Sequence, residues 1–303
     1  MSFNDNAQLD PGRVRDSRGR SGGKIAAGGG GILVVLLAAL FGINPQILTD
    51  LGLGGSTSST TQQSQGTEGA QSADCQTGAD ADQRSDCRII GTVQSLDAFW
   101  GPYLDKYSVE HADPEVEIFA DAVNTGCGQA SSDVGPFYCP ADQTGYFDVG
   151  FFDLLRDRFG ADGGALAEEY VVAHEYGHHI QNEIGTLQYS QQGGTGPTSG
   201  AVRVELQADC FAGLWASYAS ETKDESGNTF LEPFTKADLQ SALSAAQAVG
   251  DDRIQEASTG RVMPEAWTHG SAAQRQAWFL QGYQTGDINK CNTLEASDLN
   301  NPA

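Results

Sequence analysis

The chain has 303 residues, of which 40 are acidic and 17 basic, so its formal net charge is −23. This charge excludes a nucleic-acid partner, which needs a basic face, because basic residues cluster only before residue 25. Hydrophobic residues make up 39% of the chain, which excludes a wholly disordered protein and favours one globular domain.

The first 24 residues carry a net charge of +2, which leaves −25 for the rest. Residues 25–43 have no charged side chain, and these 19 residues approach the ~20 that a transmembrane helix needs. A buried core helix and a cleavable signal peptide are the alternatives, but a run of four glycines weakens a soluble helix and the apolar run is long for a signal peptide. We therefore predict an uncleaved anchor in the lipid bilayer, with residues 1–24 in the cytoplasm and the remainder outside it.

Residues 44–74 are predicted to be a flexible tether, because most of them are Gly, Ser, Thr and Gln. An extracytoplasmic domain is then expected over residues 75–303. All six cysteines lie in it, and an even number in an exported segment indicates disulfides. Six cysteines allow 15 pairings. We expect neighbours to pair, at positions 75 and 87, 127 and 139, and 210 and 291.

The domain is expected to be α+β, mostly helical with a small sheet. Hydrophobic periodicity predicts strands over 115–123, 135–139 and 145–149, and helices over 92–107, 151–159, 164–184, 201–219, 235–249 and 272–285. Two capping boxes, Thr235 with Asp238 and Ser271 with Gln274, are predicted to start the last two helices. The stretch 127–140 either offers an edge strand to an extended peptide or is a covered sheet edge.

A metal site is indicated within the predicted helix 164–184. His174 and His178 are four residues apart, so they project from one helical face and can bind one Zn²⁺. Glu175 lies beside them, and its carboxylate can accept a proton from a water that attacks a polarised carbonyl. His179 points away from that face, which predicts a residue on the helix surface or one that supports a ligand.

A catalytic zinc ion usually has three protein ligands, so the two histidines need a partner. Glu205 and Asp209 lie four residues apart among apolar residues of the predicted helix 201–219, and buried acids need partners of their own. Zinc ligation by Glu205, with Asp209 bonding to a ligand histidine, would satisfy both. The alternative is a solvated acid pair. His269, before the last helix, either stabilises an oxyanion or bonds locally at the helix start.

Several segments resemble the putative neutral zinc metallopeptidase family of single-pass bacterial membrane proteins. They are HEYGHH, ELQADCFAG, CGQASSDVGPFYCP, and GDDRI followed by THGSAAQR and WF, and they span about residues 87–293. ELQAD is also similar to the Glu-x-x-x-Asp segment of gluzincin peptidases. That resemblance implies that Glu205 is the third zinc ligand and that Asp209 supports a ligand.

THGSAAQR resembles the His-Pro segment of gluzincins, with Gly270 in the place of proline. The resemblance implies that His269 and Arg275 act on the substrate or the transition state.

Together these features predict a membrane-anchored zinc endopeptidase with a zincin-like domain, which hydrolyses a peptide or protein substrate outside the cytoplasm. One Zn²⁺ is held by His174, His178 and Glu205, and Glu175 is the general base. Two alternatives stay open: a non-catalytic, zinc-containing envelope protein that binds peptides, and a metal-dependent amidase that acts on cell-wall peptides.

Overall fold

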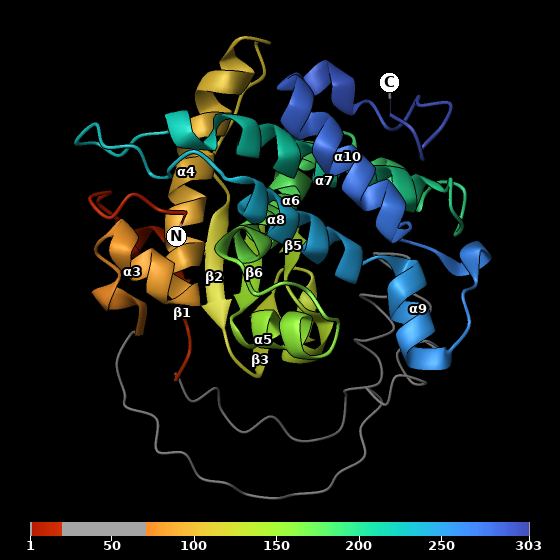
Figure 1. The fold of residues 1–303 in the computed structure, drawn as a ribbon, viewed down its shortest axis with the longest axis horizontal. Coiled ribbons are helices and arrows are strands. Elements are labelled where there is room, and N and C mark those ends of the chain that lie inside the picture. The colour runs from red at the N-terminus through yellow and green to blue at the C-terminus, as the bar shows by residue number, and fades with distance from the viewer. Residues whose placement is uncertain (1, 20–70, 303) are drawn as a thin grey trace, which may run out of the picture.

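The computed structural model describes residues 2–19 and 71–302, in which helices surround a small mixed sheet (Figure 1). The predicted α+β class is therefore confirmed. The transmembrane helix predicted over residues 25–43, and most of the tether predicted over 44–74, lie outside these described ranges. Among the residues that are described, none of the helices combines the length and the apolar character that a membrane crossing requires.

The main sheet has four strands in the order β1-β2-β6-β5. Strands β1, β2 and β6 run parallel, and β5 pairs antiparallel with β6 at one edge. A separate hairpin is formed by β3 and β4, because Asp121 has a φ of 64° and turns the chain within the predicted strand 115–123. The bounds are β1 Arg15–Asp16, β2 Glu115–Phe119, β3 Ala122–Thr125, β4 Gly128–Ser131, β5 Phe137–Cys139 and β6 Thr144–Asp148.

Each predicted helix is present, but α4 begins at Ser85, well before the predicted start at residue 92. Both predicted capping boxes are present at the starts of α8 and α10. The short, charged α9 was not predicted, because Ile254 is its only large apolar residue and gives no periodicity. The bounds are α3 Gly78–Gln83, α4 Ser85–Asp105, α5 Gly150–Asp157, α6 Ala165–Glu183, α7 Gly200–Tyr218, α8 Lys236–Ala248, α9 Asp251–Thr259 and α10 Ala272–Thr285.

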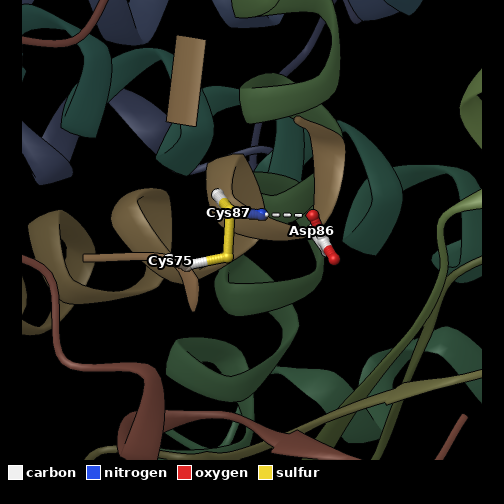
Figure 2. A group of neighbouring side chains, drawn as sticks. All are labelled: Cys75, Asp86 and Cys87. Carbon is white, nitrogen blue, oxygen red and sulfur yellow. Dashed lines mark hydrogen bonds between the residues drawn. A yellow bond between two sulfur atoms is a disulfide. The ribbon is translucent and has the colours of Figure 1, made fainter. Parts of the chain in front are cut away.

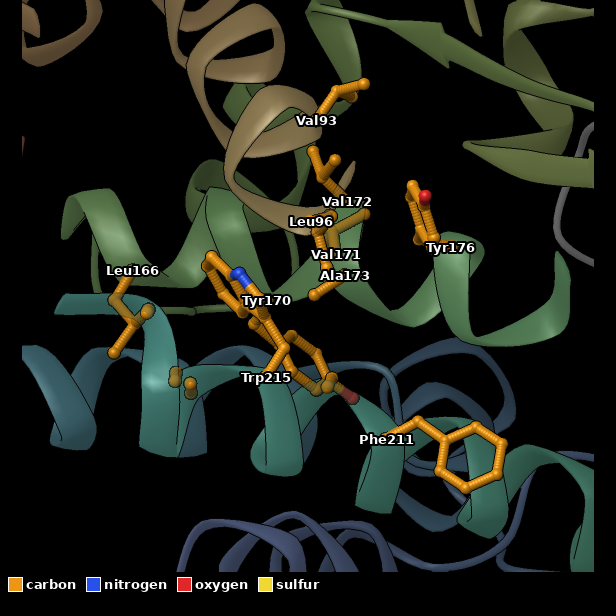
Figure 3. Close-up of a cluster of buried hydrophobic side chains, with 14 of the residues drawn as sticks. Val93, Leu96, Leu166, Tyr170, Val171, Val172, Ala173, Tyr176, Phe211 and Trp215 are labelled. Atoms are coloured by element: carbon orange, nitrogen blue, oxygen red, sulfur yellow. The ribbon is translucent and has the colours of Figure 1, made fainter. Parts of the chain in front are cut away.

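The core lies where α6 packs between α4, α7 and α8. Figure 3 shows side chains of α4, α6 and α7 that meet there, among them Val93, Val172 and Trp215, and all three are buried. Helices α7 and α10 approach through glycines, since a Cβ on Gly213 would lie only 1.9 Å from the carbonyl oxygen of Phe279. The core therefore fixes the position of α6 and α7, which carry the predicted metal ligands.

All three predicted disulfides are confirmed: Cys75–Cys87, Cys127–Cys139 and Cys210–Cys291. The first joins the segment before α3 to α4, the second joins the turn between β3 and β4 to β5, and the third ties α7 to the C-terminal segment. Residues 71–74, which were expected to belong to the tether, form a short 3₁₀ helix beside the first disulfide.

The N-terminal segment, residues 2–19, is part of the domain. Phe3, Leu9 and Val14 are buried in the main core, and β1 within this segment extends the sheet. Arg13 donates two hydrogen bonds to Asp97 of α4, at 2.6 and 3.0 Å. The prediction that residues 1–24 form a separate basic segment is therefore wrong for residues 2–19. Their apolar side chains are too widely spaced to show a periodicity, and their partners lie far away in the sequence.

Candidate metal centre

Close packing of α6 and α7 brings the predicted ligands together. Gly177 lies on α6 between the ligand histidines, and a Cβ there would come within 3.2 Å of backbone atoms of Ala208 on α7. The absence of a side chain at this position lets the two helices approach. As a result, Glu205 and Asp209 on α7 face the histidines of α6, and all of these side chains are buried.

The ligand atoms of His174, His178 and Glu205 all lie within 4.8 Å of one another. Glu205 Oε2 is 3.2 Å from His174 Nε2, and Glu205 Oε1 is 3.5 Å from His178 Nε2. Tetrahedral zinc with bonds near 2.0–2.1 Å separates neighbouring ligand atoms by roughly 3.3 Å. The spacing and the chemistry of these three donors therefore fit a zinc ion.

Hydrogen bonds orient both imidazoles. His174 Nδ1 lies 2.9 Å from Asp209 Oδ1, and an ionised carboxylate only accepts, so this nitrogen carries the hydrogen. His178 Nδ1 similarly lies 2.8 Å from Oε1 of Gln181, which is also only an acceptor. Each neutral ring thus turns the lone pair of Nε2 towards the Glu205 carboxylate. A lone pair that faces a carboxylate is repelled unless a cation or a proton lies between them. Metal-binding histidines are typically held by such a hydrogen bond at the other ring nitrogen, as His174 and His178 are here.

Asp209 is fully buried and joins three elements at this site. Besides His174, it accepts hydrogen bonds from the Tyr170 hydroxyl at 2.5 Å and from Arg275 Nε at 2.8 Å. Burial alone would raise the pKa of Asp209, but Arg275 and His174 lower it to about 2. The carboxylate is therefore ionised at neutral pH and holds His174 in place.

Charges in the site also shift the pKa values of Glu205 and His174. Burial opposes ionisation of Glu205, yet His178, His269 and His174 hold its pKa well below the usual range. Burial lowers the pKa of His174, whereas Asp209 and Glu205 raise it to about 9. Without a metal ion, a proton is thus favoured on the nitrogen that faces Glu205. Metal and proton compete for this position.

Glu175 is buried on α6 and faces the sheet, where it lines a small cavity with Tyr138, Phe147 and Tyr176. Within residues 2–19 and 71–302, no hydrogen bond or ion pair engages its carboxylate. Glu175 is therefore not committed to a structural partner.

His269 lies in the turn before α10, and its side chain is 28% exposed. Asp251 at the start of α9 holds this turn, since its Oδ2 accepts the backbone N–H groups of Thr268, His269 and Gly270 at 2.7, 2.7 and 3.0 Å. Gly270 has a φ of +90°, a conformation that a side chain disfavours. Burial lowers the pKa of His269, but Glu205 and Asp251 raise it above the usual value. The raised pKa favours the protonated, positively charged form of this imidazole, which lies at the exposed side of the centre.

Arg275 does not occupy the position that the resemblance implied. Its side chain is buried, its donors go to Asp209 and to the backbone carbonyl of Val249, and its Nη2 also lies 3.2 Å from Nδ1 and 3.4 Å from Nε2 of His174. Arg275 therefore supports Asp209 from inside the protein and is not exposed to a substrate.

Two other groups of potential ligands in the described residues have different explanations. Cys75 and Cys87 lie beside Asp86, but their sulfur atoms form a disulfide (Figure 2). His111, His179 and Glu183 form the other group. It was missed because His111 is far away in the sequence, and His179 is buried rather than on the helix surface.

Short contacts show that this last group is hydrogen-bonded. His111 Nδ1 lies 2.6 Å from Glu183 Oε2, and His179 Nε2 lies 2.7 Å from the carbonyl oxygen of Ala112. These distances are typical of hydrogen bonds and shorter than the separation of neighbouring zinc ligands. The group ties the loop before β2 to α6.

The sequence profile of a family described as putative neutral zinc metallopeptidase matches residues 4–294. The match starts at residue 4, within the N-terminal segment, and so is wider than the motifs alone suggested. An uncharacterized protein of Mycobacterium tuberculosis H37Rv is 58% identical over 226 residues, which cover 74% of this chain and 76% of that protein. One of Escherichia coli K12 is 42% identical over 215 residues, 69% of this chain and 70% of its own length. No solved structure matches the chain.

Proposed function

Because the chain belongs to the putative neutral zinc metallopeptidase family, we propose that it is a zinc-dependent endopeptidase. The observation that carries this proposal is the convergence of His174, His178 and Glu205 with both imidazoles held in the zinc-binding tautomer. Zinc bound by these three residues would act as a Lewis acid, polarising a carbonyl group and lowering the pKa of water.

The neighbouring side chains supply the remaining chemistry in this proposal. Glu175 accepts the proton of the attacking water and passes it to the leaving amine, as general base and then general acid. Protonated His269 donates to the oxyanion that forms on the substrate carbonyl. Asp209 keeps His174 oriented throughout, because it is held by Tyr170 and Arg275.

An extended peptide is the substrate form that the sheet favours. Strand β5 is an edge strand of the four-stranded sheet and lies beside α6, so a peptide that paired with this edge would be held extended near the metal-binding helix. The three disulfides favour an oxidising compartment outside the cytoplasm for the domain. Attachment to the membrane by a single crossing of residues 25–43 would require a state in which residues 2–19 are not docked on the domain.

The test compares zinc content and peptide hydrolysis in the full chain and in Glu175→Gln. The amide cannot accept a proton, so we expect this variant to keep zinc and to lose ~10² to 10⁴-fold of the activity. Glu168→Gln is the matched control on the same helix, because Glu168 pairs with Arg88 away from the metal centre. Activity of Glu175→Gln near that of the unaltered chain would refute the proposed mechanism, and zinc-free protein without hydrolysis would refute the proposed function.

A further inference from the structure

The N-terminal segment reaches the surroundings of Glu175 through Arg13. The Arg13 guanidinium donates two hydrogen bonds to Asp97 of α4, at 2.6 Å from Nε and 3.0 Å from Nη2. Its Nη2 also donates to the backbone carbonyl oxygen of Pro114, in the loop before β2, at 2.8 Å. One cation therefore fastens α4 and this loop to each other.

The same two elements hold the hydroxyl of Tyr176, the residue that follows Glu175 on α6. This hydroxyl donates to Asp97 Oδ1 at 3.1 Å, and His111 Nε2 of the loop lies 3.3 Å from it. Asp113 Oδ1, also in the loop, lies 3.4 Å from the same hydroxyl. The Tyr176 side chain is buried, so its position depends on these contacts as well as on the core.

Residues of these elements enclose the side of Glu175 that faces the sheet. The cavity there is lined by Val93 of α4, Pro114 of the loop and Tyr176, besides residues of the sheet; Figure 3 shows Val93 and Tyr176 on the same side of α6. The cavity leaves about 10 Å³ for the centre of a water molecule, which is near the least that one water needs. Movement of α4 or of the loop therefore changes the packing against Glu175 directly.

The zinc ligands depend on other contacts. Asp209 holds His174 from α7, and Gln181 holds His178. Within residues 2–19 and 71–302, the hydrogen bonds of Arg13 do not reach Asp209 or Gln181. Loss of Arg13 should therefore disturb Glu175 and leave the metal ligands in place.

We propose that Arg13 is a positioning residue for Glu175, so that docking of residues 2–19 completes the catalytic site. This inference rests on the proposed role of Glu175 as general base. Burial raises the pKa of Asp97, and Arg13 opposes this shift. Loss of Arg13 thus weakens the charged acceptor of the Tyr176 hydroxyl and also removes the link between α4 and the loop. A displacement of about 1 Å at a catalytic group costs ~10²-fold in rate.

The test compares Arg13→Met with Arg15→Met in the full chain with zinc. Arg15 is the matched control, because it lies in the same segment, its side chain is 66% exposed, and it pairs with Glu117 of the sheet at 3.5 Å. In Arg13→Met we expect kcat to fall ~10 to 100-fold, while KM and zinc content stay unchanged. Arg13→Lys keeps the charge but not the fork of donors, so it should recover part of the lost kcat.

Two results would overturn the proposal: a kcat of Arg13→Met equal to that of Arg15→Met, or a loss of activity that only follows a loss of zinc. Tyr176→Phe breaks the same chain of contacts at its other end and keeps the ion pair of Arg13 and Asp97. It therefore decides the matter if Arg13→Met fails to fold. We expect it to lower kcat at unchanged zinc content, and an unaltered kcat in this variant would also overturn the proposal.

Hydrogen exchange gives a measurement that needs no activity, so it separates this proposal from the proposed function. In Arg13→Met, the amides of residues 109–113 and 173–177 should exchange at least about tenfold faster than in the unaltered chain, while those of α7 should not change. Unchanged exchange in both segments would overturn the proposal, whether or not the chain hydrolyses peptides. Faster exchange in a chain that hydrolyses no peptide would refute the proposed function and support the coupling of Arg13 to this part of α6.

Discussion

Replacing Asp209 is expected to destabilise the protein more than replacing Arg275, although the two residues form one buried ion pair. Asp209→Ala removes the carboxylate that accepts from Nε and Nη2 of Arg275, and leaves a cation that is 3% exposed without this counterion, in contact with the Val249 carbonyl and the His174 ring. Breaking a buried pair in this way typically costs about 3–5 kcal/mol. Arg275→Met leaves a carboxylate that still accepts from Tyr170 and His174. This second variant should therefore lose less, about 1–3 kcal/mol.

The double variant separates the pair from its surroundings. With both charges gone, the unpaired guanidinium no longer exists, so the cost of Asp209→Ala plus Arg275→Met should fall below the sum of the two single costs. Residues in direct contact show coupling of about 0.5–3 kcal/mol, and we expect the upper part of that range. Asp209→Ala should also bind zinc more weakly, by ~10 to 100-fold, because His174 loses the partner of Nδ1.

Urea unfolding of the zinc-free protein, with a chelator present, measures these costs without the contribution of metal binding. The midpoints should fall in the order of unaltered chain, Arg275→Met and Asp209→Ala, with equal slopes. Additive single costs, or an Asp209→Ala midpoint above that of Arg275→Met, would refute the argument. Either result would mean that the guanidinium finds solvent or another partner when Asp209 is absent.

Three further predictions concern the metal centre. Glu205→Ala should purify nearly free of zinc, because it loses one of three protein ligands; metal analysis that shows full occupancy would contradict this ligand assignment. The apparent zinc affinity should rise about tenfold per pH unit up to about pH 9 and then level off. The reason is that zinc must displace the proton that His174 binds with a pKa of about 9. Zinc titrations that give the same affinity between pH 6 and 9 would exclude this competition. In Asp251→Asn, the pKa of His269 should fall, because a negative charge that favours the imidazolium is lost. The alkaline limb of the pH–activity profile should therefore move to lower pH. An unmoved limb would show that His269 does not titrate in the reaction.

Features that depend on local spacing could be predicted from the sequence. The two histidines of α6 and the two acids of α7 are each one helical turn apart, and burial of the acids required a partner, so the sequence could place them on facing sides. The capping boxes at Thr235 and Ser271 likewise depend on residues three apart. The disulfides joined neighbouring cysteines in the chain order.

Features that depend on distant contacts could not be predicted in this way. His111 and Glu183 are 72 residues apart, and their hydrogen bond follows from the course of the loop before β2. Asp251 holds the turn of His269 from a short helix without hydrophobic periodicity. Arg275 was expected near the substrate on the basis of a family motif. A motif shows that a cation is present at a position, but it does not show which way the side chain points.

The docked N-terminal segment has a consequence for how the chain is placed at a membrane. Residues 2–19 contribute core side chains and a strand to the fold of residues 71–302, so in this state both parts share one aqueous compartment. A single crossing by residues 25–43 would separate them, which makes that arrangement and this fold mutually exclusive. A membrane-impermeant thiol reagent can distinguish them with Asn6→Cys and Glu225→Cys variants, since both positions are exposed. Labelling from the same side would mean that the N-terminus accompanies the domain, and labelling from opposite sides would mean that the anchored protein keeps its first strand apart from its sheet.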